Sequence, residues 1–205
     1  MFVVDRYVRE NDTVWDIGSN LGILSFCAAL RAGASGQVYS LEADPRYADI
    51  QSRSLMRFPA HAARVDILCA AVAGEMGILE LLIPKKGHAR NHLTSVGGNS
   101  AGEAEVCKPV ITVTLDWLLD HWQAPDFVKI DVEGAEVLAV QGGSRLFREV
   151  RPASYIECAK ENRKFMTDYF KGLDYEFFAL DDSGNEQAIP EFVFNTVVKP
   201  REKCG

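Results

Sequence analysis

The stretch Thr13-Val14-Trp15-Asp16-Ile17-Gly18-Ser19-Asn20-Leu21-Gly22 decides the fold, because it predicts a strand, a glycine turn and the start of a helix. Its first five residues are β-branched or aromatic apart from Asp16, which is typical of a strand. The apolar residues at 21–30 suit a helix packed against a sheet. Gly18 and Gly22 let the backbone turn sharply and approach a ligand closely. In open α/β sheets, ligands bind outside the carboxyl ends of the strands, where this turn lies.

An acidic residue ends the next predicted strand, over residues 37–42, and indicates which ligand the turn binds. The carboxylate of Glu42 can accept hydrogen bonds from both hydroxyls of a ribose. A dinucleotide fingerprint needs a third glycine so that a helix N-terminus can hold a pyrophosphate. Here Asn20 stands where that glycine would fall, and a carboxylate of Asp16 in the crevice repels phosphate and attracts ammonium. S-adenosylmethionine carries an ammonium and a sulfonium but no phosphate, so we expect it to be the cofactor.

The composition predicts one domain over residues 1–205, because this length buries a substantial core and 47% of the residues are hydrophobic. The formal net charge of -7 argues against a nucleic-acid partner, which favours a basic surface. Five scattered cysteines form no Cys-x-x-Cys pair, and neither a signal segment nor an apolar run of membrane-spanning length is evident. We expect a cytoplasmic protein that acts on a small molecule without a membrane partner, and a homo-oligomer stays open.

Strands and helices alternate along the chain, which predicts an α/β fold with a doubly wound, mostly parallel sheet. Asp44 is a predicted helix N-cap, with Pro45 at the first helical position. The last two strands are expected to pair in antiparallel fashion. Strands are predicted at residues 13–17, 37–42, 64–69, 77–83, 127–131, 153–157, 175–180 and 192–198. Helices are predicted at residues 2–10, 20–31, 45 onward, 135–142 and 160–171.

The stretch from residue 84 to residue 108 interrupts this alternation. Its first half is basic, in an acidic protein, and its second half is rich in glycine. A connection of this length is either functional or a solvated surface loop. The functional interpretation is a lid, or substrate loop, that meets an anionic or polyhydroxylated acceptor. His88 and His92 lie within it, but they lack further Cys or His ligands at a suitable spacing, so no metal site is expected there.

A second motif with several charged residues lies at residues 129–136, with the sequence Lys-Ile-Asp-Val-Glu-Gly-Ala-Glu. It begins in the last residues of the predicted strand 127–131 and continues into the next helix. Alternation places Lys129 and Asp131 on one face of the strand, with Asp131 at its carboxyl end beside the crevice. Such a carboxylate suits a general base that takes a proton from a hydroxyl, or a ligand of a hard cation. Glu133 lies in the following turn. For Glu136 we favour a supporting role, because the helix dipole itself favours acids in the first turn.

Three stretches resemble the signature blocks of FkbM-type methyltransferases: Asp-Ile-Gly-Ser-Asn-Leu-Gly at residues 16–22, Thr-Leu-Asp-Trp-Leu-Leu at 114–119, and residues 129–136. The resemblance covers roughly residues 14–157, and the third block is the most specific. It implies a class I methyltransferase fold, with a Rossmann-like seven-stranded sheet and an antiparallel closing strand. It also implies S-adenosylmethionine as donor and O-methylation of a hydroxyl on a sugar or secondary metabolite.

Carried over by position, the resemblance assigns adenine to the chain near Ala70 and Ala71, and the ribose to Glu42. The other cofactor-binding residues that it implies are Asp16, Gly18, Ser19, Asn20, Gly22 and Asp131. One position departs from the family pattern, because Cys158 follows Glu157 where a histidine is expected.

For the reaction, Asp131 is the predicted general base and Glu133 its positioning partner, with His88 or His92 as the second choice. A magnesium or calcium ion held by Asp131 and Glu157 is a further hypothesis with little support in the sequence. Three other functions stay open: an N-methyltransferase of similar fold, a nicotinamide-dependent oxidoreductase, and a non-catalytic subunit that binds S-adenosylmethionine. The acceptor is not identified by the sequence.

Overall fold

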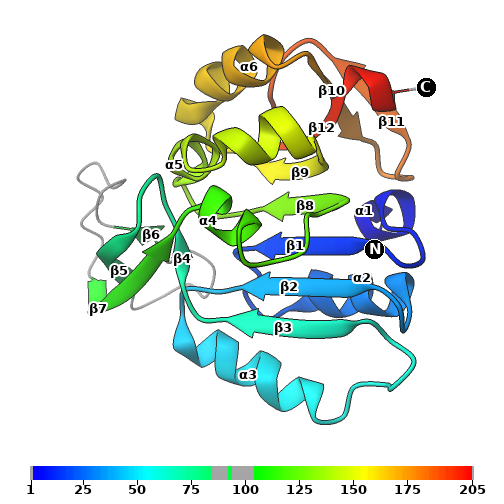
Figure 1. Cartoon of the computed structure of the whole chain (residues 1–205). Coiled ribbons are helices and arrows are strands. Elements are labelled where there is room, and N and C mark those ends of the chain that lie inside the picture. The colour runs from blue at the N-terminus through cyan, green and yellow to red at the C-terminus, as the bar shows by residue number, and fades with distance from the viewer. Residues whose placement is uncertain (1, 85–91, 94–103, 205) are drawn as a thin grey trace.

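The computed structural model describes residues 2–84, 92–93 and 104–204, and its main layer is an eight-stranded sheet (Figure 1). The strand order is β11-β10-β12-β9-β8-β1-β2-β3. Neighbours from β9 to β3 pair in parallel, whereas β12 is antiparallel to β9 and β10, and β11 is antiparallel to β10. The strands are β1 (Thr13–Ile17), β2 (Gln37–Leu41), β3 (Arg64–Leu68), β8 (Phe127–Ile130), β9 (Ala153–Glu157), β10 (Tyr175–Leu180), β11 (Glu186–Ile189) and β12 (Asn195–Pro200).

Helices cover both faces of this sheet, as a doubly wound fold requires. Apolar side chains of α1 and α2 pack with β1, β2 and β3 in one core cluster. The other cluster joins the opposite face of the sheet to α4, α5, α6 and a π-helical turn. The helices are α1 (Phe2–Tyr7), α2 (Ile23–Ala32), α3 (Pro45–Leu55), α4 (Leu115–Leu119), α5 (Glu136–Gln141), the π-helix Leu146–Val150, and α6 (Arg163–Gly172), with 3-10 turns at Lys160–Asn162 and Arg201–Lys203. No helix in the described part of the chain has the length and hydropathy of a membrane span.

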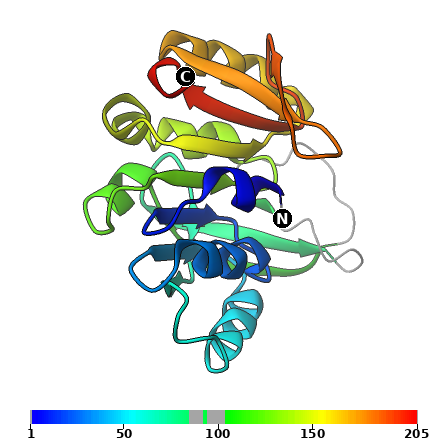
Figure 2. The ribbon, with the colours of Figure 1, turned by 90° about the vertical axis from the view of Figure 1, so that its right-hand side faces the viewer.

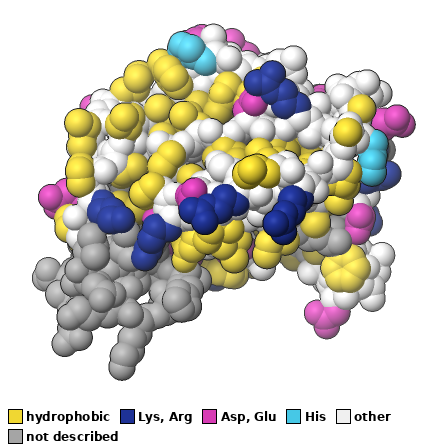
Figure 3. Space-filling model, turned by 90° about the horizontal axis from the view of Figure 1, so that it is seen from below, with side chains coloured by type: hydrophobic (Ala, Val, Ile, Leu, Met, Phe, Trp, Pro, Cys, Tyr) yellow, Lys and Arg dark blue, Asp and Glu magenta, His cyan; other side chains and the backbone are white. Residues whose placement is uncertain are grey.

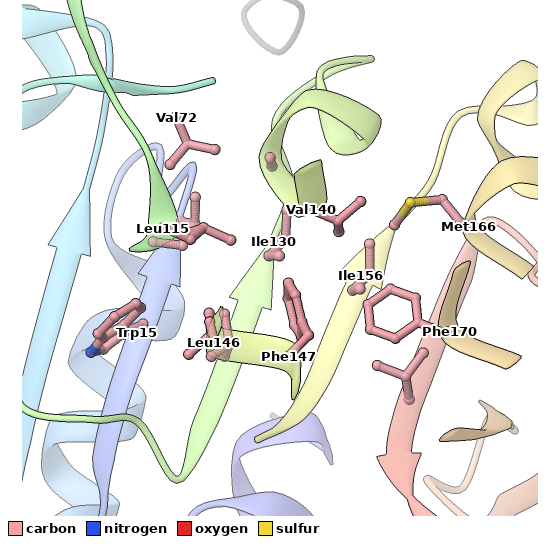
Figure 4. Packing of buried hydrophobic residues seen from close by; sticks show 14 of the residues in the cluster. Trp15, Val72, Leu115, Ile130, Val140, Leu146, Phe147, Ile156, Met166 and Phe170 are labelled. Atoms are coloured by element: carbon pink, nitrogen blue, oxygen red, sulfur yellow. The ribbon is translucent and has the colours of Figure 1, made fainter. Parts of the chain in front are cut away.

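The larger core cluster fixes the position of β1 and β8, whose ends carry the predicted site (Figure 4). Trp15 and Ile130 are fully buried, together with Phe147 and Phe170 from the helical layer. Burial of each such side chain contributes about 1.5–3 kcal/mol. Alternation along β1 therefore leaves Val14 and Asp16 on the opposite face, toward α2.

A second sheet stands at the carboxyl ends of the parallel strands (Figure 1). Its order is β4-β7-β5-β6, and a small apolar cluster of Ala71, Leu81, Val110 and Ala135 joins it to the start of α5. This second sheet lies next to the carboxyl edge of the main sheet, where the site is expected. Its strands are β4 (Ala71–Val72), β5 (Gly77–Pro84), β6 (His92–Leu93) and β7 (Ala104–Val113).

The predicted α/β sheet with parallel strands and an antiparallel closing pair is confirmed, with two corrections. The sheet has eight strands rather than seven, because β11 adds to the edge of β10. The segment 84–108, expected to be a connection, forms strand at both ends and at β6. Lys108 and Pro109 interrupt the apolar pattern of β7, which hid that strand in the sequence. Residues 85–91 and 94–103, including His88, lie outside the described residues.

Candidate functional site

A pocket that is partly open to solvent lies at the carboxyl edge of the parallel strands, between them and the second sheet. Its walls come from the turns after β1 and β8, the end of β2, the first turn of α3, the chain around β4, and β5. The lining residues are Gly18, Asn20, Leu41, Glu42, Ala43, Tyr47, Ala70, Ala71, Val72, Leu81, Asp131, Val132, Glu133 and Ala135.

The turn after β1 needs glycine at position 18. Gly18 has a φ of +74°, and a Cβ added there would lie 1.8 Å from the carbonyl oxygen of Asp131. The backbones after β1 and β8 thus approach each other more closely than any side chain permits. Asn20 follows with a φ of +53°, which asparagine tolerates better than most residues. α2 begins at Ile23, later than predicted, and Gly22 before it also has a left-handed φ, of +78°.

Glu42 lies directly after β2 and is almost fully buried in the pocket wall. Its two carboxylate oxygens accept the backbone N–H groups of Asn20, at 2.7 Å, and of Asp44, at 2.8 Å. Burial raises the pKa of Glu42, against the lowering effect of these two N–H donors. Each carboxylate oxygen offers two lone pairs, so both oxygens can accept a further hydrogen bond from a ligand.

One wall of the pocket is apolar. Ala70, Ala71, Val72 and Leu81 line it, and each is at most 5% exposed. Tyr47, from the first turn of α3, also lines the pocket. An apolar wall beside a carboxylate fits a nucleoside, whose base prefers apolar contact and whose ribose needs acceptors.

Asp16 differs from the expectation that its carboxylate faces the crevice. It is fully buried on the α2 side of β1, where Oδ2 accepts the hydroxyl of Ser25 at 2.6 Å. Its Oδ1 lies 3.5 Å from the ammonium of Lys129, the residue directly opposite on β8. The period of two along a strand directs this side chain under the helix rather than over the sheet edge.

Ser19 and Gly22 also lie outside the pocket lining, because both contact α3. The amide of Gln51 donates to the Ser19 hydroxyl at 2.9 Å and to the Asn20 carbonyl at 2.7 Å, and accepts the Ser40 hydroxyl at 2.6 Å. A Cβ on Gly22 would lie 2.9 Å from the Gln51 side chain. These contacts with α3 fix the conformation of the turn on the side away from the pocket.

The carboxylates after β8 divide into a pocket-facing pair and a supporting residue. Asp131 and Glu133 line the pocket, and Glu133 holds a left-handed φ of +45°. Glu136 is buried instead; its oxygens accept the Gly134 N–H at 2.8 Å and the Asn162 amide at 2.6 Å. The supporting role favoured for Glu136 agrees with this geometry.

A match to a family model follows the same residues. The model described as a methyltransferase FkbM domain matches residues 16–182, which is most of the chain. The chain belongs to the FkbM methyltransferase family. The match begins at Asp16, the last polar residue of β1, and extends past β10.

Solved structures share the fold of this FkbM domain at low sequence identity. It is similar to a crystal structure of methyltransferase FkbM from Methylobacillus flagellatus KT, with a TM-score of 0.61 and 15% identity, over 92% of this chain and 43% of that one. The chain thus spans less than half of that relative.

It is also similar to precorrin-6y C5,15-methyltransferase from Geobacter metallireducens GS-15, with a TM-score of 0.54 and 13% identity, over 96% of this chain and 83% of that one. A third neighbour is Aeropyrum pernix fibrillarin with natively bound S-adenosyl-L-methionine, with a TM-score of 0.50 and 12% identity, over 94% of this chain and 68% of that one. No curated protein matches the sequence significantly.

The side chains present fit S-adenosylmethionine, the donor implied by this family. The described lining holds three carboxylates, Glu42, Asp131 and Glu133, and neither lysine nor arginine. Such a lining disfavours phosphate and favours a ligand with positive charge. As for a metal, the described residues contain no group of three or more His, Cys, Asp or Glu side chains that could hold one.

Several contributors to the FkbM site were not predicted from the sequence: Ser25, Tyr47, Gln51 and Asn162. Gln51 could have been found from its spacing, since it lies three residues after Ala48 and both belong to the buried face of α3. Asn162 left none, because it meets Glu136 only through the tertiary fold. His92 belongs to β6, but its side chain lies outside the part of the structure that is described.

The surface beside α3 carries basic and apolar side chains together (Figure 3). The side chains of Arg53 and Arg64 are each 76% exposed, and Met56 and Ile50 are exposed near Arg53. Each of the two arginines pairs with a neighbouring aspartate, Asp49 or Asp66, and the formal net charge of the chain is -7. The expectation of no nucleic-acid partner depended on that net charge and stays a prediction.

Proposed function

We propose that this FkbM domain is an S-adenosylmethionine-dependent O-methyltransferase that acts on a hydroxyl of a sugar or secondary-metabolite-type small molecule. One observation carries the proposal: the pocket at the Gly18 turn combines an apolar wall with carboxylates and, among its described residues, no basic side chain. Family membership supports the methyl donor. The acceptor class is an inference from the family resemblance and the polar edge of the pocket.

In this proposal Glu42 accepts the ribose hydroxyls, and Ala70 and Ala71 contact the adenine. Gly18 and Asn20 present backbone groups to the methionine end. When bound, S-adenosylmethionine supplies a methyl group that its sulfonium has already activated. The protein then has to orient the acceptor oxygen and exclude water.

Asp131 is the proposed proton acceptor for the hydroxyl. It lines the pocket, and its side chain is 26% exposed, so an acceptor can reach it. Glu133, in the same turn, is the proposed partner that positions Asp131 or shares its proton. The segment 84–108 is proposed to cover the acceptor, with His88 and His92 as alternative bases, and residues 1–205 to act as a single domain.

Calorimetry tests the donor. We expect S-adenosylmethionine and S-adenosylhomocysteine to bind wild type with micromolar Kd and NAD not to bind. Glu42→Ala should weaken the adenosyl ligands at least tenfold, whereas Asp168→Asn, a change of an exposed carboxylate on α6, should leave Kd unchanged. Binding of NAD alone would overturn the proposal. If none of the three ligands binds, the donor assignment is contradicted and only the similarity of fold remains.

Asp131→Asn tests the proton acceptor. In an assay that detects S-adenosylhomocysteine release with a panel of hydroxylated and amine acceptors, we expect kcat to fall about 10²–10⁴-fold. The Kd for S-adenosylhomocysteine should change much less. Undiminished kcat in this variant would show that another residue is the base. Turnover with amine acceptors alone would show that the protein is an N-methyltransferase and not an O-methyltransferase.

A further inference from the structure

One buried cation lies directly beneath the proposed active site, and the mechanism above does not use it. Lys129 is 7% exposed, and its ammonium contacts three groups from two strands. It donates to the carbonyl oxygen of Gly18 at 2.6 Å and lies 3.2 Å from Asp131 and 3.5 Å from Asp16. The contact with Gly18 is a hydrogen bond and the other two are ion pairs; Asp16 Oδ1 itself has no hydrogen-bond partner among the described residues.

The strand register explains why these groups meet. Asp16 and Lys129 are direct partners on the parallel strands β1 and β8. Gly18 and Asp131 lie two residues further along the chain, in the turns that follow the two strands. The Asp131 N–H also donates to the Ile17 carbonyl at 3.0 Å, so the two turns leave the sheet side by side.

A purely structural role for Lys129 would be to neutralise Asp16. Burial of an unpaired carboxylate is costly, so this explanation has force. The distances argue for more, because the ammonium lies nearer to Gly18 and Asp131 than to Asp16. Its two shorter contacts are both to pocket-lining residues, one from each turn.

We propose that Lys129 is a positioning residue that joins the Gly18 turn to the Asp131 carboxylate, so that the donor-binding and acceptor-binding parts of the pocket keep one fixed separation. This inference rests on the proposed function and adds to it. Lys129 itself does not line the pocket and touches no ligand; it acts through the two residues that do.

The charge state required for this role is maintained. Burial by itself would lower the pKa of Lys129, but the attraction of Asp16 and Asp131 outweighs it and raises that pKa. Glu157, at the end of β9, adds to the same attraction. The side chain is therefore an ammonium at neutral pH, with all its protons available for donation.

The test compares Asp16→Asn with the double variant Asp16→Asn/Lys129→Met. The asparagine introduced in both variants can still accept the Ser25 hydroxyl, and the double variant leaves no unpaired charge at either position. The probe is S-adenosylhomocysteine by calorimetry, together with hydrogen exchange of the Gly18 and Ser19 amides. Lys199→Met serves as a control, since Lys199 is a half-buried lysine paired with Glu186 away from the pocket.

We expect the double variant to bind S-adenosylhomocysteine at least tenfold more weakly than Asp16→Asn, with faster exchange at the two amides. The control should lower Tm without changing Kd. Equal Kd and exchange in the single and double variants would overturn the inference. If the double variant does not fold, Asp16→Asn/Lys129→Gln allows the same comparison. Failure of wild type to bind the probe would instead contradict the proposed function, so the two failures are distinct.

Discussion

Gly18 is the residue on which the pocket geometry depends most directly. Its left-handed backbone and the 1.8 Å approach of the Asp131 carbonyl to a notional Cβ leave no space for a side chain. Gly18→Ala should cost more than the about 1–2 kcal/mol of a left-handed non-glycine residue, because the β8 turn must also move. We expect a Tm lower by several degrees and weaker binding of S-adenosylhomocysteine, measured by thermal unfolding and calorimetry.

The control for that change is Gly172→Ala, at the end of α6. Nothing lies within 4 Å of a Cβ added there. Alanine in a helix is favoured over glycine by about 0.5–1 kcal/mol, so this variant should keep or slightly raise Tm. Equal losses of stability in the two variants would contradict the role assigned to Gly18.

Glu42 gives the site a pH dependence. Because burial raises its pKa above the ordinary 4.5, protonation begins at a higher pH than for an exposed glutamate. The ionised form accepts hydrogen bonds at both oxygens, so we expect S-adenosylhomocysteine affinity to fall as pH drops through that raised pKa. The same protonation relieves the burial of charge, so Glu42 does not destabilise the ligand-free fold as pH falls.

The measurement is Kd against pH for wild type and Glu42→Gln. The variant lacks the titrating group, and it should show weaker binding with a flatter pH dependence. An equally steep dependence in both proteins would assign the effect to another residue, with Glu157 the first to test, since burial and the nearby Asp131 also raise its pKa.

Among the elements, α3 supports the glycine turn through one buried amide. Gln51 is fully buried and connects α3 to Ser19, Asn20 and Ser40. Gln51→Leu leaves buried polar groups without partners, which costs about 1–3 kcal/mol. We expect lower stability in chemical denaturation and weaker S-adenosylhomocysteine binding. Gln187→Leu, at an exposed position of β11, is the matched control and should change neither the stability nor the binding. Unaltered binding in Gln51→Leu would show that the turn keeps its conformation without this contact from α3.

At the scale of the whole molecule, both ends of the described chain lie away from the second sheet, on the side where the parallel strands begin (Figures 1 and 2). There Glu186 of β11 accepts hydrogen bonds from Tyr7 of α1 and from Lys199 of β12, the latter at 2.9 Å. Arg6 adds an ion pair at 3.5 Å. This cluster attaches the first helix to the last strands.

Lys199→Met should therefore destabilise the fold by about 1–3 kcal/mol, because it removes a charged hydrogen-bond donor from a half-buried partner. Lys164→Met breaks an exposed pair with Asp168 and should cost about 0–1 kcal/mol. Chemical denaturation measures both, and cofactor affinity should be the same in each. A larger loss for Lys164→Met would be inconsistent with this difference in burial.

Local patterns were sufficient for most elements. Asp44 caps α3 by accepting the Arg46 N–H at 3.0 Å, with Pro45 in the first turn, as predicted from two adjacent residues. β1, β9 and β10 have the predicted bounds because alternation and β-branched residues act within a few positions. β11 was missed, since it has only four residues, two of them polar, and it is a strand only through pairing with β10.

By itself, the sequence determined the class of fold, the family, and which glycines and acids follow the parallel strands. These features depend on short-range spacing and on residue chemistry. Only the tertiary structure decided which acids face the pocket. Asp16 and Glu136 resemble Asp131 and Glu133 in the sequence, yet the first two are buried against Ser25, Lys129 and Asn162. Strand register and helix packing direct each carboxylate to a partner, and those partners are distant in the chain.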